Sequence, residues 1–379
     1  METLVFGGSF DPPHAAHLKL LTAALKRRPR ARALVSPAWR SPLKGLPSAP
    51  ARERLAMTAA ALRTLPTPLR SRATVDDWEL LQGRTVYTYE VLRRLKAVRP
   101  SSPLTFLAGG DSWETLPRWK RWTELKGLAS FLIGRRPGAP APKPGPGRPA
   151  LEVLPGVFPD LSSTGLRARL LLGESPRELA AAVLAAARSL YGAGLRASLG
   201  RELPDGRWEH TLAVARMALA LAERHGLDAE RAVLAGLLHD CGRAVPAPQL
   251  AAFCRRRRLA VPALAETAER APILLHAHAS EDRARDVYGV TDEAVLSAVR
   301  KHTLGDAVMS PLDRLLYAAD ACSADRKFPE AARIRRAALK DLNAGFREAM
   351  RVKLAFVLKE GAWLHPAAPA AWNAAWEDA

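Results

Sequence analysis

The chain has 379 residues, of which 48% are apolar and 25% charged, and its 57 lysines and arginines against 38 acidic residues give a formal net charge of +19. At roughly 100–200 residues per domain, this length predicts two or three domains with cores of their own, and the composition excludes a disordered or fibrous chain. Three cysteines without a CxxC pair exclude a disulfide framework and a cysteine-based zinc knuckle.

The start of the sequence lacks the basic and apolar regions of a secretory signal, and the apolar run around residues 180–187 is far shorter than the roughly 20 residues that span a bilayer. We therefore expect a cytoplasmic protein without a membrane partner. The positive charge favours acidic partners such as nucleotides, polyphosphates or nucleic acid. Nucleic acid is the minor hypothesis, because the arginine run 255–258 has no interleaved aromatic residue and no known binding module is recognisable.

The first half of the chain alternates strand and helix signals. Apolar runs at residues 3–6, 33–36, 104–107 and 130–133 are typical of buried strands, and the first run ends in a Gly-Gly turn. Helix-compatible stretches separate these runs, the first of them over residues 18–25. Strands that alternate with helices predict an α/β domain, with a parallel sheet that is covered by helices on both faces.

The end of this first domain is not marked by its most conspicuous low-complexity segment, the proline-rich stretch 136–150. The motif Ser162-Ser163-Thr164 lies beyond that stretch and belongs with the first half, so we interpret the stretch as a surface excursion. A helix is expected over residues 176–190. We place the boundary shortly after it, near residues 192–199, and take residues 1–195 as the first domain.

The second domain, residues 196–379, is predicted to be all-α, since few strand signals interrupt its helical pattern. Its expected helices cover residues 208–225, 228–238, 281–288, 291–301, 311–322 and 329–345. The tail from residue 363 onward is at best amphipathic and suggests no role.

The segment GGSFDPPHAAH, residues 7–17, joins the first predicted strand to the first helix. Glycines allow a sharp turn whose N–H groups approach an anion, and Pro13 suits the first turn of a helix. His14 and His17 are three residues apart and share a face at the positive end of that helix. Two imidazoles beside a glycine turn suit the charge that develops on a polyphosphate during reaction. This segment therefore predicts a phosphate site with two catalytic histidines.

These residues closely resemble the signature of the nucleotidyltransferase superfamily, HxGH after a first strand, and among its members the bacterial nicotinate-mononucleotide adenylyltransferases. The resemblance covers residues 1–195. It continues through the segments Ser41-Pro42-Leu43-Lys44, Arg54-Leu55-Ala56-Met57, Arg84-Thr85-Val86-Tyr87-Thr88-Tyr89, Gly109-Gly110-Asp111, residues 116–122 and Ser162-Ser163-Thr164-Gly165-Leu166-Arg167. The chain departs from the family at Ala16, where the signature has glycine, at Leu43, where histidine is common, and in its short proline-rich stretch. Because alanine adds only one methyl group, we expect altered affinity rather than lost activity.

The resemblance implies a Rossmann-like domain in which the 5′-phosphate of nicotinate mononucleotide attacks the α-phosphorus of ATP, with Mg²⁺ as cofactor. His14 and His17 would stabilise the transition state. The residues implied to bind ATP are Gly7, Gly8, Ser9, Phe10, Lys44, Ser163, Thr164 and Arg167. Those implied to bind the mononucleotide are Thr85, Asp111 and Trp119. Asp111 would contact the ribose or Mg²⁺, and Trp119 would stack on the pyridine ring, with a place in the core as its equal alternative.

A second set of polar residues follows residue 200, where each member lies on or beside an apolar helical stretch. The set consists of His210, His239, Asp240, His276, His302 and Asp320. One such histidine is more often a satisfied core residue, but five or six ligand-type residues together favour a shared metal centre. Nitrogen and oxygen donors without cysteine leave iron, manganese, zinc and magnesium open.

The pattern H…HD…H…H…D resembles the HD phosphohydrolase superfamily. The strings LLHDCGR at 237–243, LLH at 274–276, RKHT at 300–303 and YAAD at 317–320 are most similar to bacterial HD proteins that hydrolyse diadenosine tetraphosphate to two ADP. This resemblance covers about residues 200–350. Ser323 stands where that family has glutamate, whereas Arg326 matches its arginine. His225 and His278 fall outside the pattern and are expected at the surface.

The second resemblance implies metal-assisted hydrolysis of dinucleoside polyphosphates, with two divalent ions, iron or manganese in the first place, bridged by Asp240. The other five residues of the set would complete the two ligand shells. Two alternatives remain open: an HD domain that regulates the first domain by binding nucleotides or cleaves another nucleotide, and a nucleic-acid-binding protein. Oligomeric state is not predicted.

Overall fold

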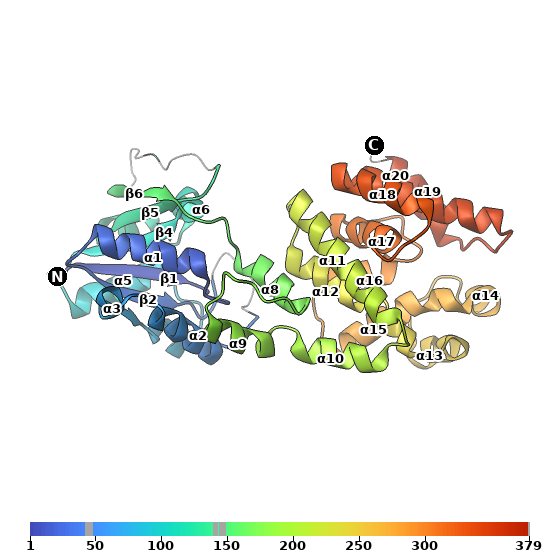
Figure 1. The fold of residues 1–379 in the computed structure, drawn as a ribbon, viewed down its shortest axis with the longest axis horizontal. Coiled ribbons are helices and arrows are strands. Elements are labelled where there is room, and N and C mark those ends of the chain that lie inside the picture. Colours follow the sequence, from blue (N-terminus) through green and yellow to red (C-terminus); the bar gives the residue numbers. More distant parts are fainter. Residues whose placement is uncertain (42–47, 139–142, 144–148, 378–379) are drawn as a thin grey trace. The chain divides into compact units, whose positions relative to one another are not determined.

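The computed structural model describes residues 1–41, 48–138, 143 and 149–377, which form two compact units (Figure 1). Unit 1 consists of residues 1–170 and 175–191, and unit 2 of residues 171–174 and 192–379. The predicted α/β domain followed by an all-α domain is confirmed. The boundary between residues 195 and 196 stays a prediction.

The centre of unit 1 is a six-stranded parallel sheet in the order β3-β2-β1-β4-β5-β6. Its strands are β1 Thr3–Gly8, β2 Arg32–Pro37, β3 Ala73–Val75, β4 Leu104–Gly109, β5 Ser130–Arg135 and β6 Leu151–Val157. The strand order reverses between β1 and β4, so their carboxyl ends form the edge where open α/β sheets bind ligands. The loop after β1 therefore lies at this edge.

The two edge strands, β3 and β6, were not predicted. β3 has only three residues, and β6 contains Pro155 and Gly156, which disguise a strand because proline is tolerated only where its missing N–H is not needed. Edge strands meet that condition, because they pair with a neighbouring strand on one side only. Their sequences therefore carry the weakest apolar signal.

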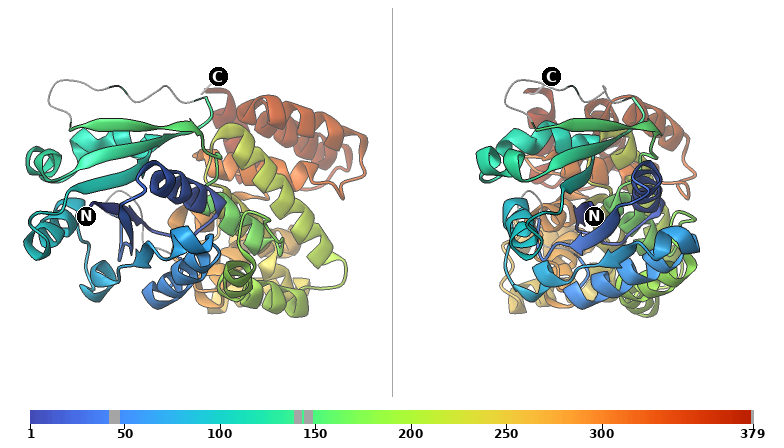
Figure 2. Two further views of the ribbon diagram at one scale, coloured as in Figure 1. Left: turned by 60° about the vertical axis from the view of Figure 1, so that its left-hand side comes forward. Right: turned by 90° about the vertical axis from the view of Figure 1, so that its left-hand side faces the viewer.

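Helices cover both faces of the sheet, because successive side chains of a strand point to opposite sides. Leu4 packs in one cluster with α1 Ala15–Arg27, and Val5 in another with α5 Thr88–Val98. Figure 2 shows these two helices on opposite sides of the strands. The other helices of this part are α2 Ala51–Arg63, α3 Thr67–Arg70, α4 Trp78–Leu81, α6 Gly110–Thr115, α7 Trp122–Leu128, α8 Ser163–Leu171 and α9 Ala181–Leu190.

The predicted helix 176–190 begins only at residue 181. The residues before it form a turn in which the carbonyl of Glu178 accepts a 2.8 Å hydrogen bond from the N–H of Ala15. The carbonyl of Glu178 therefore accepts a hydrogen bond from the first turn of α1 and not from a helix over residues 176–190.

Unit 2 contains helices joined by turns and loops, and no strand lies among its described residues. Its helices are α10 Ala193–Glu202, α11 Arg207–His225, α12 Ala229–Leu238, α13 Leu250–Arg256, α14 Leu264–Arg270, α15 His276–Asp286, α16 Glu293–Lys301, α17 Pro311–Cys322, α18 Pro329–Lys340, α19 Leu342–Lys359 and α20 Ala367–Glu377. In the part of the chain that the structure describes, each helix is too short or too polar to cross a membrane.

Two predicted helices of unit 2 differ from the structure. The segment predicted over 281–288 starts earlier, at His276, and ends at Asp286. The segment predicted over 329–345 is two helices, which break at Asp341. The side chain of Asp341 accepts a 2.6 Å hydrogen bond from the N–H of Ala344 and so caps α19. A local cap thus ends one helix and begins the next, and apolar periodicity does not reveal this.

Candidate functional sites

His14 ends the loop after β1 and is the N-cap of α1, so Pro13 precedes the helix instead of opening it as predicted. The backbone N–H of His14 donates to Nδ1 of His17 over 3.2 Å, and the two rings stack with their centroids 3.8 Å apart. The predicted histidine pair is therefore brought together at the positive end of α1, beside the carboxyl edge of the sheet.

The imidazole of His14 is buried, with 4% of the residue exposed, and its Nδ1 has no hydrogen-bond partner in the structure. Burial, together with the positive charge of Arg136, lowers the pKa of His14 to about 4. The ring is therefore neutral at physiological pH. A buried nitrogen without a partner is costly unless a ligand supplies one, which favours a bound polar group at this loop.

Asp11 holds the middle of this loop. Its carboxylate, which is 2% exposed, accepts hydrogen bonds from the N–H groups of Ser48 at 2.7 Å and Ala49 at 3.1 Å and from the hydroxyl of Tyr191 at 2.5 Å. The buried guanidinium of Arg54 donates to the carbonyls of Ser9 at 2.9 Å and Ala49 at 3.1 Å. No role was predicted for Asp11, Arg54 or Tyr191, because most of their partners are distant in the chain.

Helix α8 brings three of the predicted ATP ligands to the same loop. Ser163 donates from Oγ to the carbonyl of Pro12 at 3.1 Å, and Arg167 donates to the carbonyl of Asp11 at 2.6 Å. Arg167 also donates to Oγ1 of Thr164 over 3.4 Å. Ser163 and Arg167 therefore support the loop directly, beside any contact that they make with a nucleotide.

Four further predicted ligands of unit 1 are placed less completely. Lys44 lies outside the described residues, as does the side chain of Asp111, whose backbone belongs to α6. Thr85 is half-buried in the segment before α5. Trp119 is also half-buried: its ring meets Phe106 edge-on at 5.7 Å, and its Nε1 donates to Thr115 at 3.3 Å. Trp119 thus packs against the core while part of the residue stays exposed.

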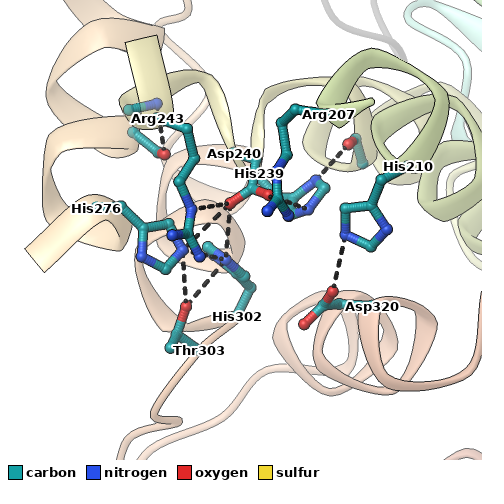
Figure 3. A network of polar contacts seen from close by, with 12 residues as sticks. Arg207, His210, His239, Asp240, Arg243, His276, His302, Thr303 and Asp320 are labelled. Atoms are coloured by element: carbon teal, nitrogen blue, oxygen red, sulfur yellow. Dashed lines mark hydrogen bonds and ion pairs between the residues drawn. The ribbon is translucent and has the colours of Figure 1, made fainter. Parts of the chain in front are cut away.

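In unit 2 the six predicted metal ligands converge from five helices and the turns that follow them (Figure 3). They are His210 on α11, His239 and Asp240 after α12, His276 at the start of α15, His302 after α16 and Asp320 on α17, and all six are buried. Two groups of three, His210 with His239 and Asp320, and His239 with Asp240 and His302, each have their ligand atoms within 4.8 Å of one another.

Hydrogen bonds orient each histidine of this cluster. Nδ1 of His239, His276 and His302 lies 2.6–2.7 Å from the carbonyl of the residue three positions earlier. A carbonyl can only accept, so Nδ1 carries the hydrogen and Nε2 presents its lone pair to the cluster. Nδ1 of His210 lies 2.7 Å from the carboxylate of Asp325. Metal-binding histidines are commonly held in this way.

The Nε2 atoms face one another and the two aspartates. Nε2 of His276 is 3.1 Å from Nε2 of His302 and 3.2 Å from Oδ1 of Asp240, and Nε2 of His239 is buried without a hydrogen-bond partner. The hydroxyl of Thr303 lies within 3.2 Å of both facing nitrogens but has one hydrogen to donate. Lone pairs that face each other in a buried site are unfavourable without a cation or proton between them. The donor set therefore fits divalent metal.

Cationic side chains surround both aspartates. Arg207 and Arg243 lie 2.9 and 3.2 Å from the carboxylate of Asp240. Burial alone would raise the pKa of Asp320, but the charge of Lys353, the neighbouring His210 and the charge of Arg326 hold it well below its usual range. Both carboxylates are thus ionised and available as ligands. Of these cations, sequence reasoning noted only Arg326 and, within a motif, Arg243.

The departure at Ser323 has a structural role. Its hydroxyl donates to Oδ1 of Asp325 at 2.6 Å, and the other oxygen of Asp325 contacts His210. The expectation that His225 and His278 lie at the surface is wrong, since both are half-buried. His225 bonds through Nε2 to the carbonyl of Ala338 at 2.6 Å, and burial, then Arg300, lowers the pKa of His278 to about 4.

Two family models match the chain, Cytidylyltransferase-like over residues 5–169 and HD domain over residues 207–325. A Mycoplasma genitalium protein named probable nicotinate-nucleotide adenylyltransferase/Ap4A hydrolase is 27% identical over 328 residues, which are 86% of this chain and 88% of the relative. A Marinobacter nauticus protein named probable nicotinate-nucleotide adenylyltransferase is 32% identical over 197 residues, 46% of this chain and 88% of the relative.

A solved structure from Clostridium acetobutylicum, described as a predicted HD superfamily hydrolase involved in NAD metabolism, is 31% identical and covers 49% of this chain and 97% of its own, with a TM-score of 0.47. The resemblances indicated by the motifs of both halves are confirmed by the family matches and the curated relatives. The chain belongs to the nicotinate-nucleotide adenylyltransferase family and carries an HD domain after its adenylyltransferase part.

Proposed function

We propose that unit 1 transfers the adenylyl group of ATP to nicotinate mononucleotide, forming the deamido form of NAD and pyrophosphate. The observation that carries this proposal is the loop after β1, in which the buried, neutral His14 has an Nδ1 without a hydrogen-bond partner and the carbonyl of Pro12 accepts from Ser163 of α8. The names of the relatives from Mycoplasma genitalium and Marinobacter nauticus support the same reaction.

In this proposal the 5′-phosphate of the mononucleotide attacks the α-phosphorus of ATP and pyrophosphate leaves, with no covalent intermediate on the enzyme. The imidazoles of His14 and His17 donate hydrogen bonds to the phosphate oxygens on which charge develops. Lys44 and Arg167 neutralise the phosphates, and the N-terminus of α8 adds backbone N–H groups. The reaction therefore depends on positioning and charge rather than on a nucleophilic side chain.

Mg²⁺ is proposed to enter this site with the phosphates of ATP. Among the described side chains of unit 1, there is no cluster of metal-ligating residues, and the carboxylate of Asp11 is already occupied by N–H and O–H donors. Mg²⁺ commonly binds substrate phosphates and waters with few protein ligands. Asp111 is the proposed protein contact.

Incubation of the full chain with ATP and either nicotinate or nicotinamide mononucleotide, with products read by chromatography, tests the transfer. We expect the nicotinate form to outcompete the nicotinamide form, since the protein resembles the nicotinate-using enzymes. His14→Ala and His17→Ala should each lower the rate by about 10²–10³-fold, as for the loss of one transition-state donor. Equal kcat/KM for both mononucleotides would remove the substrate preference, and near-normal rates in both variants would make the histidines structural.

We propose that unit 2 hydrolyses dinucleoside polyphosphates, such as diadenosine tetraphosphate, with two divalent metal ions. The observation that carries this proposal is the pair of Nε2 lone pairs of His276 and His302, 3.1 Å apart in a buried site beside Asp240. The hydrolase part of the Mycoplasma genitalium relative's name supports the substrate. We also propose that both activities operate in the cytoplasm.

The four histidines, Asp240 and Asp320 are proposed to hold the metal ions, with Asp240 as the shared ligand. Such ions supply a water of lowered pKa and neutralise charge on phosphate. Arg207 and Arg243, which pair with Asp240, would bind phosphate oxygens and keep the polyphosphate chain at the site. Iron and manganese suit this donor set of imidazole and carboxylate, so they are the proposed metals.

Asp240→Asn tests the hydrolase, with the exposed Asp205→Asn as matched control. We expect Asp240→Asn to abolish hydrolysis of diadenosine tetraphosphate and to reduce bound metal, measured by elemental analysis after purification without chelator, while adenylyl transfer continues. ADP as the sole product indicates symmetrical cleavage, whereas ATP with AMP would contradict it. Metal without hydrolysis of any dinucleoside polyphosphate in the unmodified protein would favour the regulatory alternative.

A further inference from the structure

A lysine from outside the matched HD domain reaches the metal-ligand cluster of unit 2. Lys353 lies on α19, beyond residues 207–325. Its Nζ donates to Oδ2 of Asp320 and to the backbone carbonyl of His302, both at 3.2 Å. One ammonium group thus contacts two of the six predicted ligand residues, one from each group of three.

The two carboxylate oxygens of Asp320 have different partners. Oδ1 lies 3.3 Å from Nε2 of His210 and also accepts a hydrogen bond from Arg326, whereas Oδ2 faces Lys353. A carboxylate turns easily about its last torsion. A cation held on one oxygen limits that rotation, and it keeps the opposite oxygen directed to the histidine.

The lysine is itself held in place. Its side chain is 30% exposed, and Nζ lies 4.0 Å from the ring centroid of Tyr317, which is on the same helix as Asp320. The face of an aromatic ring electrostatically attracts a cation that lies over it. The bond to the carbonyl of His302 ties the end of α16 to this arrangement, so Lys353 connects α16, α17 and α19 at the cluster.

We infer that Lys353 is a positioning residue of the metal centre, which orients the carboxylate of Asp320 and the backbone at His302 for metal binding. This inference rests on the proposed metal-dependent function. Loss of a residue that orients metal ligands typically weakens metal binding or activity by about 10- to 100-fold. The part of the molecule needed to bind metal therefore extends beyond the HD match, into α19.

The test is a calorimetric titration of Mn²⁺ alone into chelator-treated full-length protein. Lys353→Met should bind Mn²⁺ about 10- to 100-fold more weakly than the unmodified protein, and Lys353→Arg should recover part of the loss because it keeps the charge. Lys359→Met, at an exposed position of the same helix, is the matched control and should bind as the unmodified protein does. Circular dichroism melts report whether each variant folds. If Lys353→Met does not fold, the Mn²⁺ affinity of Lys353→Arg decides the role of Lys353.

Unchanged Mn²⁺ affinity in both Lys353 variants would overturn the inference. If the KM for diadenosine tetraphosphate then rises, the lysine binds substrate instead. An unmodified protein that binds no Mn²⁺ would overturn the inference and the metal-dependent function together. If the unmodified protein binds Mn²⁺ but leaves diadenosine tetraphosphate intact, only the proposed substrate is contradicted. The Mn²⁺ titrations would still decide the role of Lys353.

Discussion

The hydroxyl of Tyr191 donates a 2.5 Å hydrogen bond to the buried carboxylate of Asp11 and so joins the last residue of unit 1 to the loop between β1 and α1. Both residues are almost fully buried, at 4% and 2% exposure. The same carboxylate accepts from the N–H groups of Ser48 and Ala49. The loop that carries His14 is therefore braced by two segments that come later in the chain, one 37 and the other 180 residues beyond Asp11.

Tyr191→Phe removes this bond without changing the ring. We expect the variant to lose about 1.5–3 kcal/mol of unfolding free energy, the range for a hydrogen bond to a charged group. Urea unfolding followed by circular dichroism measures the loss. Tyr89→Phe is the matched control, because the ring of Tyr89 stacks on Tyr87 and the substitution keeps that contact. Equal destabilisation by both substitutions would assign the effect to something other than the bond to Asp11.

The stability of unit 1 should fall in mild acid because of His14. Its pKa is about 4 in the folded protein, against 6.5 for the free side chain, so between these values the unfolded chain binds more protons and stability rises with pH. The contribution is complete above pH 6.5 and lost as the pH falls to about 4. At about 1.4 kcal/mol per pKa unit it amounts to about 3 kcal/mol.

Unfolding free energies at pH 7 and pH 4.5, for the unmodified protein and for His14→Gln, measure this contribution. Glutamine does not titrate, so the variant should lose less stability between the two pH values. His278, whose pKa is also lowered to about 4, is present in both proteins, and its contribution cancels in the comparison. The same pH dependence in both proteins would mean that His14 is not kept neutral by its surroundings.

Metal binding in unit 2 should depend on the chain of contacts from Ser323 through Asp325 to His210. Asp325→Ala leaves Nδ1 of His210 without its 2.7 Å partner, and we expect metal affinity to fall by about 10- to 100-fold. Ser323→Ala removes only the 2.6 Å bond that steadies Asp325, so its effect should be smaller. Elemental analysis of the purified proteins gives the metal content. A larger loss from Ser323→Ala than from Asp325→Ala would contradict this order.

Gly242 allows the turn after Asp240 to pack directly on α15. A Cβ at this position would lie 2.6 Å from the backbone nitrogen of Ser280 and press against the carbonyl of His276. We expect Gly242→Ala to cost at least about 2 kcal/mol in unfolding free energy, since rigid backbone must move. It should also lower metal content, because His276 begins α15.

Gly194→Ala is the matched control for this substitution. Nothing lies within 4 Å of a Cβ added at Gly194, and the residue is inside α10, where alanine is favoured over glycine by about 0.5–1 kcal/mol. This variant should be neutral or slightly more stable in chemical unfolding. If Gly242→Ala behaved in the same way, the close packing of the turn on α15 would be refuted.

Local patterns made much of this molecule predictable from its sequence. The alternation of apolar runs with helical stretches predicted the parallel sheet, because side-chain spacing reports the element that a segment forms. The segment of residues 7–17 and the histidine and aspartate pattern were recognisable because each motif keeps its residue types at short spacings. The structure brings those six ligand-type residues of unit 2 together.

Only the tertiary structure decided which distant residues support these motifs. Tyr191 is 180 residues from Asp11, and Lys353 is 33 residues beyond Asp320. Nothing local in the sequence marks either pair. Arg54 stood in a recognised motif, yet its burial among backbone carbonyls depends on how α2 packs beneath the loop. Periodicity and motif spacing are short-range properties, whereas such pairings arise only when helices and strands pack, and for this reason the sequence predicted the elements and ligand types but not the contacts that orient them.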